Sequence, residues 1–303
     1  MKAVCAIDLG IRELKLLETD GKRVSRHAEV LLPDGALVDG APTQLLTTAI
    51  RSVMEDGGFT ANRVRVAIPE TGSAFRDFRL PAMRSSELSS AVMFEGRRLV
   101  PMDASDVYFA WHASRDQRGY AVFLVAARRD MIDGVIGVLS AAGLLVERID
   151  LKPLALARGM GVSDGLLLEW ASSEATLVLM AGGRPRFFRT FQLDAAPDDL
   201  DGQLDELVLS VNALVRFIRG SAPDVQIGAG SVLSLAGRFA FLEDGGRRAQ
   251  ERFPFKTSFP AGPAAAPAGL PWQAHFAGFG LLEKERWHNR LTPSQGGDIG
   301  VAA

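Results

Sequence analysis

Residues 2–17 read KAVCAIDLGIRELKLL, and this stretch decides the fold. A mostly apolar run leads to Asp8, and Leu14 and Leu16 follow after a polar interval. Two strands joined by a tight turn over residues 8–13 account for this pattern, because apolar runs flank a short polar segment that contains glycine. The turn is expected to lie at the end of a sheet.

The pattern continues as an α/β unit and then repeats. Residues 44–54 carry apolar side chains at helical spacing, and residues 64–68 alternate as a strand that stops at Pro69. The second unit is expected to contain strands at 165–170, 175–180 and 187–193, a helix at 203–219, a strand at 231–235 and a helix at 239–252. A similar order of elements therefore occurs twice, which predicts two similar lobes.

Between the two units the pattern has a separate β-α-β-β-α order. The expected elements are a strand at 75–81, a helix at 86–100, strands at 107–111 and 120–127, and a helix at 131–142. Asp130 is suited to cap the last helix, and Gly143 to end it. We therefore expect an insert domain over residues 74–145.

Composition argues against several classes of protein. The chain carries 34 Lys or Arg against 36 Asp or Glu, so no global field draws it onto nucleic acid or an anionic membrane. Cys5 is the only cysteine, which excludes an intramolecular disulfide and favours a reducing compartment. The four histidines lack the spacing of a metal site. The sequence has no run of about 18 uncharged apolar residues, which a membrane-spanning helix would need.

Three stretches carry a resemblance to a known family. AIDLG at residues 6–10 looks like the first phosphate motif of actin-like proteins. The second stretch runs from LPAM at residues 80–83 as far as Pro101, and the third is IDLKPLALA at residues 149–157. In order and spacing they resemble the PilM family of type IV pilus assembly proteins. The resemblance covers nearly the whole chain and is strongest over residues 64–159.

This resemblance implies an α/β fold of the actin-like, ribonuclease H-like type. It has two lobes, an insert domain of the FtsA and PilM type, and a reduced second-lobe subdomain, since only residues 194–202 separate the hairpin from the long helix. The expected domains are a first lobe at 1–73 plus 146–163, the insert at 74–145, a second lobe at 164–288 and a disordered tail at 289–303. The amphipathic stretch 272–287 carries both signs of charge, so we expect it to close the second lobe and not to anchor the chain on a membrane.

The resemblance also implies a function. PilM-like proteins are cytoplasmic and bind the short N-terminal tail of an inner-membrane PilN-like protein. We therefore expect a cytoplasmic scaffold that is held at the inner membrane through partners, contacts other pilus or secretion proteins, and neither inserts into the membrane nor binds nucleic acid. The tail-binding groove is expected between the first lobe and the insert.

GspL cytoplasmic domains of type II secretion share this architecture, so a secretion scaffold is one alternative. A nucleotide-binding actin-like ATPase or an enzyme of the sugar-kinase class is another.

Finally, the resemblance implies where a nucleotide would bind. The matching positions are Asp8, Gly10 and Lys15 in the first phosphate motif, Glu169 in the second, and Ala236 and Gly237 in the adenosine motif. In one interpretation, Asp8 orders the water shell of Mg²⁺ and Lys15 reaches a phosphate of Mg-ATP. In the other, Asp8 is a turn residue and Lys15 is the polar member of an alternating strand.

Departures from the family pattern favour the second interpretation. Ile11, Arg12 and Glu13 stand where small hydroxyl residues are usual, and Glu13 brings like charge toward a phosphate. Trp170 follows Glu169 where the second motif needs a small turn. We therefore expect a degenerate site that binds Mg-ATP weakly or not at all, with no meaningful hydrolysis, no catalytic residue and no metal ligand, because phosphoryl transfer needs a firmly positioned phosphate.

Overall fold

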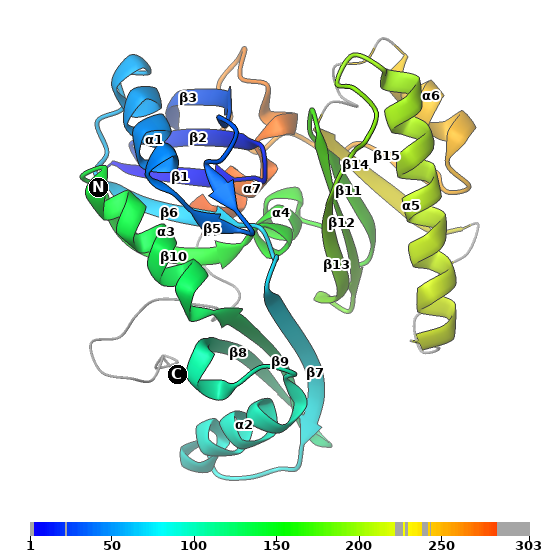
Figure 1. Ribbon diagram of the computed structural model, residues 1–303. Coiled ribbons are helices and arrows are strands. Elements are labelled where there is room, and N and C mark those ends of the chain that lie inside the picture. The colour runs from blue at the N-terminus through cyan, green and yellow to red at the C-terminus, as the bar shows by residue number, and fades with distance from the viewer. Residues whose placement is uncertain are drawn as a thin grey trace.

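The computed structural model describes residues 3–21, 23–221, 227, 230–237, 242 and 244–283. Figure 1 shows two lobes side by side, with a smaller unit extending below the first lobe. The described strands form two five-stranded sheets, a three-stranded sheet and a two-stranded hairpin. The tail expected at 289–303 lies outside the described residues. Among the helices described, none has the length and apolar character to cross a membrane.

The first lobe is a five-stranded sheet covered by helices. Its elements are β1 (Val4–Leu9), β2 (Glu13–Thr19), β3 (Val24–Leu31), β4 (Leu37–Val38), β5 (Ala41–Pro42), α1 (Gln44–Asp56), β6 (Arg63–Ile68), β10 (Leu145–Leu151) and α4 (Lys152–Met160). The sheet order is β10-β6-β1-β2-β3, with β1, β2 and β3 antiparallel and β6 and β10 parallel to β1. Nearly all of β1 and β2 is buried, as expected of central strands with both faces covered.

The second lobe repeats this connectivity. Its elements are β11 (Gly165–Trp170), β12 (Glu174–Ala181), β13 (Arg184–Gln192), α5 (Leu200–Ser221), β14 (Val232–Gly237), α6 (Gly245–Arg252) and β15 (Lys256–Ser258). The order β13-β12-β11-β14-β15 again joins three antiparallel strands to two parallel ones. A short connection separates β13 from α5, so the second-lobe subdomain is reduced as expected. Of the helix predicted at 239–252, residues 239–241 and 243 lie outside the described residues.

A third, separate sheet forms the insert. It consists of β7 (Ser73–Leu80), β8 (Val107–Asp116) and β9 (Gly119–Arg128) in the order β7-β9-β8, with α2 (Ser85–Leu99) against it. Both pairings are antiparallel, and none of the three strands pairs with either five-stranded sheet. The insert therefore has a small core of its own, which includes Val92, Trp111 and Leu124.

One helix assigned to the insert belongs elsewhere. The buried face of α3 (Arg129–Ala141) carries Met131, Ile132, Val135 and Leu139, and the helix packs mainly against α1, β5 and β10 of the first lobe. The expected insert boundary at residue 145 is therefore too late. The apolar stripe predicts that this helix has a buried face, but it does not specify which of two neighbouring cores receives that face.

The C-terminal stretch also packs on a different lobe from the one expected. A 3-10 helix (Trp272–Ala274) leads into α7 (Phe276–Leu282), whose apolar side chains join the first-lobe core. The expectation that residues 272–287 close the second lobe is thus wrong for α7, which contacts α4, β1 and β6, whereas the 3-10 helix before it contacts β14 of the second lobe. Residues 284–287 lie outside the described residues.

Three arginines hold the C-terminal end of α7. Arg148 Nη2 donates to the Leu281 carbonyl at 2.5 Å, Arg65 Nη1 to the same oxygen at 3.0 Å, and Arg158 Nε to the Gly280 carbonyl at 3.2 Å. These guanidinium groups satisfy carbonyls that the helix itself leaves without partners, and their charge suits its negative end. All three come from the first lobe, which explains why α7 docks there.

Candidate functional site

Two turns face each other where the lobes meet. The turn between β1 and β2 closes with Gly10 N–H donating to the Glu13 carbonyl at 2.8 Å, and the turn between β11 and β12 closes with Ala171 N–H donating to the Glu174 carbonyl at 2.9 Å. The two turns are therefore equivalent, as the repeated strand order predicts.

Each turn receives a carboxylate from the other. Glu174 Oε2 accepts from Ile11 N at 2.6 Å and from Arg12 N at 3.3 Å. In return, Glu13 Oε1 accepts from Ser172 N at 2.7 Å and also from the Ser172 hydroxyl. The backbone N–H groups of Gly10, Ile11, Arg12, Ala171 and Ser172 are therefore already bound within the chain.

Six buried charged residues surround this contact, and we call them the interlobe charge cluster. They are Asp8, Glu13, Lys15, Lys152, Glu169 and Glu174, each at most 3% exposed. Lys152 Nζ lies 3.0 Å from Glu174 Oε1, 3.2 Å from Glu169 Oε2 and 3.7 Å from Asp8 Oδ2. Lys15 Nζ lies 3.5 Å from Glu13 Oε2 and 3.7 Å from Glu169 Oε1. Four carboxylates thus share two ammonium groups.

This imbalance shifts the protonation of the cluster. Burial, together with the nearby Glu169 and Glu174, outweighs the attraction of the lysines and raises the pKa of Asp8 to about 6. Burial acts to lower the pKa of Lys152, but Asp8, Glu169 and Glu174 outweigh it and raise that pKa well above its usual range. Both lysines therefore stay charged, and Asp8 gains a proton as the pH falls through about 6.

A pH-dependent change in stability follows from Asp8. Since its pKa is higher in the folded chain than in the unfolded chain, the folded state binds the extra proton between about pH 6 and pH 4, and this contribution to stability grows as the pH falls through that window. We expect Asp8→Asn to raise the free energy of unfolding at pH 8, and this gain to disappear below about pH 4. Urea denaturation across this pH range measures both.

The control for this prediction is Asp34→Asn, at an exposed side chain. It should leave the free energy of unfolding within about 0.5 kcal/mol of the unsubstituted chain. A gain for Asp8→Asn that does not change with pH would contradict the assignment of the titration to Asp8.

The structure brings together most of the residues predicted at the nucleotide site. Asp8, Lys15 and Glu169 meet in the interlobe charge cluster, and Gly10 lies directly beside Glu174. Ala236 and Gly237 end β14 beside β11, opposite Glu169 and Trp170. Their role in binding a nucleotide stays a prediction.

The sequence did not single out Lys152 or Glu174 for this site. Lys152 lies within the IDLKPLALA stretch that carries the family resemblance, but nothing in its spacing reveals that its ammonium group contacts three carboxylates. Glu174 begins a strand and reads as an ordinary polar strand residue.

The space above Gly10 is occupied by a carboxylate in this structure. A Cβ placed on Gly10 would lie 2.5 Å from Glu174 Oε1, so the space above this glycine, where a phosphate would approach the backbone, is filled by a carboxylate. The adjacent Trp170 is fully buried, and its indole N–H donates to Gln203 Oε1 at 2.7 Å. Within the described part of the chain, no group of three or more His, Cys, Asp or Glu is arranged to hold a metal ion.

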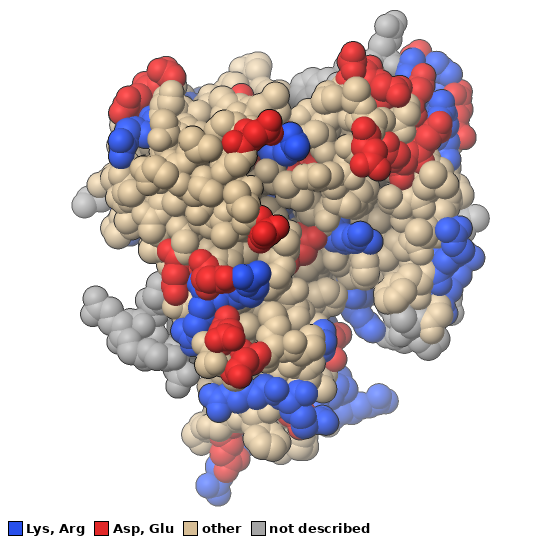
Figure 2. All heavy atoms as spheres, in the orientation of Figure 1, with Lys and Arg blue, Asp and Glu red and all other residues tan. Residues whose placement is uncertain are grey.

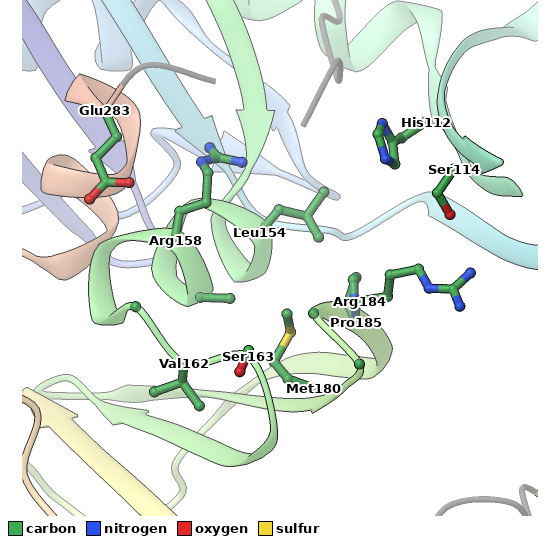
Figure 3. A pocket seen from close by; sticks show the side chains of 14 residues that line it. His112, Ser114, Leu154, Arg158, Val162, Ser163, Met180, Arg184, Pro185 and Glu283 are labelled. Carbon is green, nitrogen blue, oxygen red and sulfur yellow. The ribbon is translucent and has the colours of Figure 1, made fainter. Parts of the chain in front are cut away.

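A separate hollow lies where the two lobes and the insert meet, and we call it the junction hollow (Figure 3). It encloses about 480 Å³. Its lining includes His112 and Ser114 of β8, Leu154 and Arg158 of α4, Met180 of β12 and Pro185 of β13. Apolar and polar side chains from all three units thus line one cavity.

Contacts between the insert and the second lobe brace this hollow. The Glu70 carboxylate, just before β7, accepts from the backbone N–H of Thr190 and from its hydroxyl. The rings of Phe75 and Phe188 stack with centroids 4.3 Å apart, and Asp77 lies 3.7 Å from Arg184. Strands β7 and β13 are therefore held together by polar and apolar contacts.

A second hollow lies at the other end of β8, and we call it the charged hollow. Its lining includes Asp103, Ser105, Arg128 and Asp130, and these side chains bind one another: Arg128 pairs with Asp130, and Asp103 accepts from Ser105. On the face shown in Figure 2, basic and acidic side chains of the insert are also mixed. The polar side chains that line the charged hollow are therefore bound mainly to one another.

Comparison with known proteins identifies a family and several solved structures that this chain resembles. The family described as type IV pilus assembly protein PilM matches residues 6–181, more than half of the chain. No curated protein matches. A chain of the PilM-PilN type IV pilus biogenesis complex is similar with a TM-score of 0.72 and 20% identity, covering 92% of this chain and 97% of that chain.

Two further solved structures have the same fold. The cytoplasmic domain of EpsL, an inner membrane component of the type II secretion system of Vibrio cholerae, has a TM-score of 0.55 and 15% identity over 96% of this chain and 99% of its own. The ethanolamine utilization protein EutJ from Carboxydothermus hydrogenoformans has a TM-score of 0.53 and 12% identity over 93% and 89%. The fold is therefore actin-like, and the chain belongs to the type IV pilus assembly protein PilM family.

Proposed function

We propose that this chain is a cytoplasmic scaffold of a type IV pilus that binds the short cytoplasmic tail of a PilN-like inner-membrane protein. Family membership supports the pilus over the alternative of a type II secretion scaffold. The similar PilM chain was solved in a complex with PilN, which supports the choice of partner. The scaffold is peripheral to the inner membrane through this partner and acts without enzymatic turnover.

The observation that carries the proposal is the junction hollow. An extended peptide needs a groove with apolar surface for its side chains and polar groups for its backbone. Leu154, Met180 and Pro185 provide apolar surface, while His112 and Ser114 line the side formed by the insert. Because the first lobe, the second lobe and the insert all contribute, a tail bound there contacts all three units at once.

We expect Ser114→Trp to weaken binding of the tail at least tenfold. Ser114 is exposed at the rim of the junction hollow, so an indole there occupies the cavity without disturbing the core. The measurement is isothermal titration with a synthetic peptide of the cytoplasmic N-terminus of the PilN-like protein from the same organism.

The matched control for this measurement is Ser105→Trp, at an exposed serine of the charged hollow. It should bind the peptide as the unsubstituted chain does. If Ser105→Trp abolishes binding and Ser114→Trp does not, the tail binds in the charged hollow and the proposed site is wrong.

A further inference from the structure

The two interlobe carboxylates stand at equivalent positions. Glu13 is the first residue of β2, and Glu174 is the first residue of β12. Each follows a turn closed by the same backbone hydrogen bond. Glu174 reaches across to the N–H groups of Ile11 and Arg12, and Glu13 reaches across to the N–H and hydroxyl groups of Ser172. The contact is therefore a reciprocal pair that repeats the twofold organisation of the chain.

The same geometry occupies the donors that a phosphate would need. Successive backbone N–H groups in a turn attract anions, and those of Ile11 and Arg12 are bound to Glu174 Oε2. The other oxygen of Glu174 accepts from Lys152 Nζ at 3.0 Å. An incoming phosphate would have to displace this carboxylate. It would then meet three buried carboxylates, those of Asp8, Glu13 and Glu169, against two ammonium groups, those of Lys15 and Lys152, so repulsion between like charges opposes its entry.

We infer that Glu174 and Glu13 act as resident anions: they occupy the two turns in place of nucleotide phosphates and hold the lobes closed without a ligand. Charge-assisted hydrogen bonds from a carboxylate to backbone N–H groups are stronger than neutral ones, and these are nearly sealed from water. One consequence concerns the junction hollow, whose walls come from both lobes. These carboxylates therefore fix the shape of the junction hollow before any ligand binds, and that shape does not depend on nucleotide.

Distance measurement between the lobes tests this inference. Spin labels at Ser52→Cys on α1 and Leu209→Cys on α5 report the separation, because both positions are exposed and Cys5 is fully buried. The isosteric variants Glu174→Gln and Glu13→Gln each remove one carboxylate, so we expect each to broaden the distance distribution toward longer values.

Glu18→Gln is the matched control. Glu18 is equally buried and, like Glu174, accepts from two backbone N–H groups, those of Thr60 and Ala61, but all three residues lie in the first lobe. This variant should lower the melting temperature without lengthening the distance between the lobes. Should Glu174→Gln and Glu13→Gln give the same distances as Glu18→Gln, the carboxylates do not hold the lobes and the inference is wrong.

A second measurement uses the unsubstituted chain and so does not depend on the folding of any variant. Amide hydrogen exchange at Ile11, Arg12 and Ser172 should be slow without ligand and unchanged by millimolar Mg-ATP. Added protection at these amides, with low-micromolar binding of Mg-ATP in a titration, would overturn the inference. Tail binding is measured separately through Ser114→Trp, so either proposal can fail while the other stands.

Discussion

Gly280→Ala should lower the free energy of unfolding by about 3 kcal/mol, the upper end of the usual cost of overpacking. Helices α4 and α7 cross with their backbones in contact: a Cβ on Gly280 would lie 1.8 Å from the Ala155 carbonyl oxygen, and a Cβ on Gly159 would lie 1.8 Å from the Phe276 carbonyl oxygen. A backbone carbonyl within a helix cannot turn aside as a flexible side chain can, so the helices must separate. Chemical denaturation followed by circular dichroism measures the loss.

Gly137→Ala provides the matched control for this prediction. Gly137 also lies within a helix, α3, but a Cβ there meets nothing within 4 Å. Alanine is the better helix former, so this variant should gain about 0.5–1 kcal/mol. An equal response of the two glycine positions would show that helix propensity decides the outcome and not the crossing of α4 and α7.

Lys152→Met should lower the free energy of unfolding at pH 7.5 by about 3–5 kcal/mol, the usual cost of removing one partner from a buried ion pair. Methionine nearly conserves the volume of the side chain, so little of the loss comes from packing. The change leaves Asp8, Glu169 and Glu174 buried without the cation that contacts all three.

The loss should shrink as the pH falls toward 5. In the variant, the pKa values of the stranded carboxylates rise, so the folded state takes up protons that the unfolded state does not, and its relative stability grows in acid. Urea denaturation at several pH values follows this trend. Lys256→Met, at an exposed lysine of β15, is the control and should change stability by less than about 0.5 kcal/mol. A similarly small change for Lys152→Met would mean that water reaches the cluster.

The sequence predicts well those elements that carry a clear pattern of apolar residues within their own segment. The apolar stripe of residues 203–219 predicts most of α5, and the alternation at 64–68 predicts β6. The strands β3 and β15 were missed for physical reasons. β3 is an edge strand that alternates between exposed and partly buried positions and lacks an apolar run, and β15 has only three residues. Repetition of the strand order was enough to indicate two lobes.

What the sequence by itself determined is therefore most of the helices and strands, their repetition and the family. Only the tertiary structure decided which core α3 and α7 pack against. An apolar stripe indicates that one face of a helix is buried, but it does not indicate which residues cover that face. The tertiary structure likewise decided which residues form the interlobe charge cluster. Glu174 reaches Ile11 across 163 positions of sequence, and Lys152 is buried among carboxylates from both lobes. Charge pairing of this kind depends on distance in space and on the exclusion of water, and both arise only once the lobes have closed on each other.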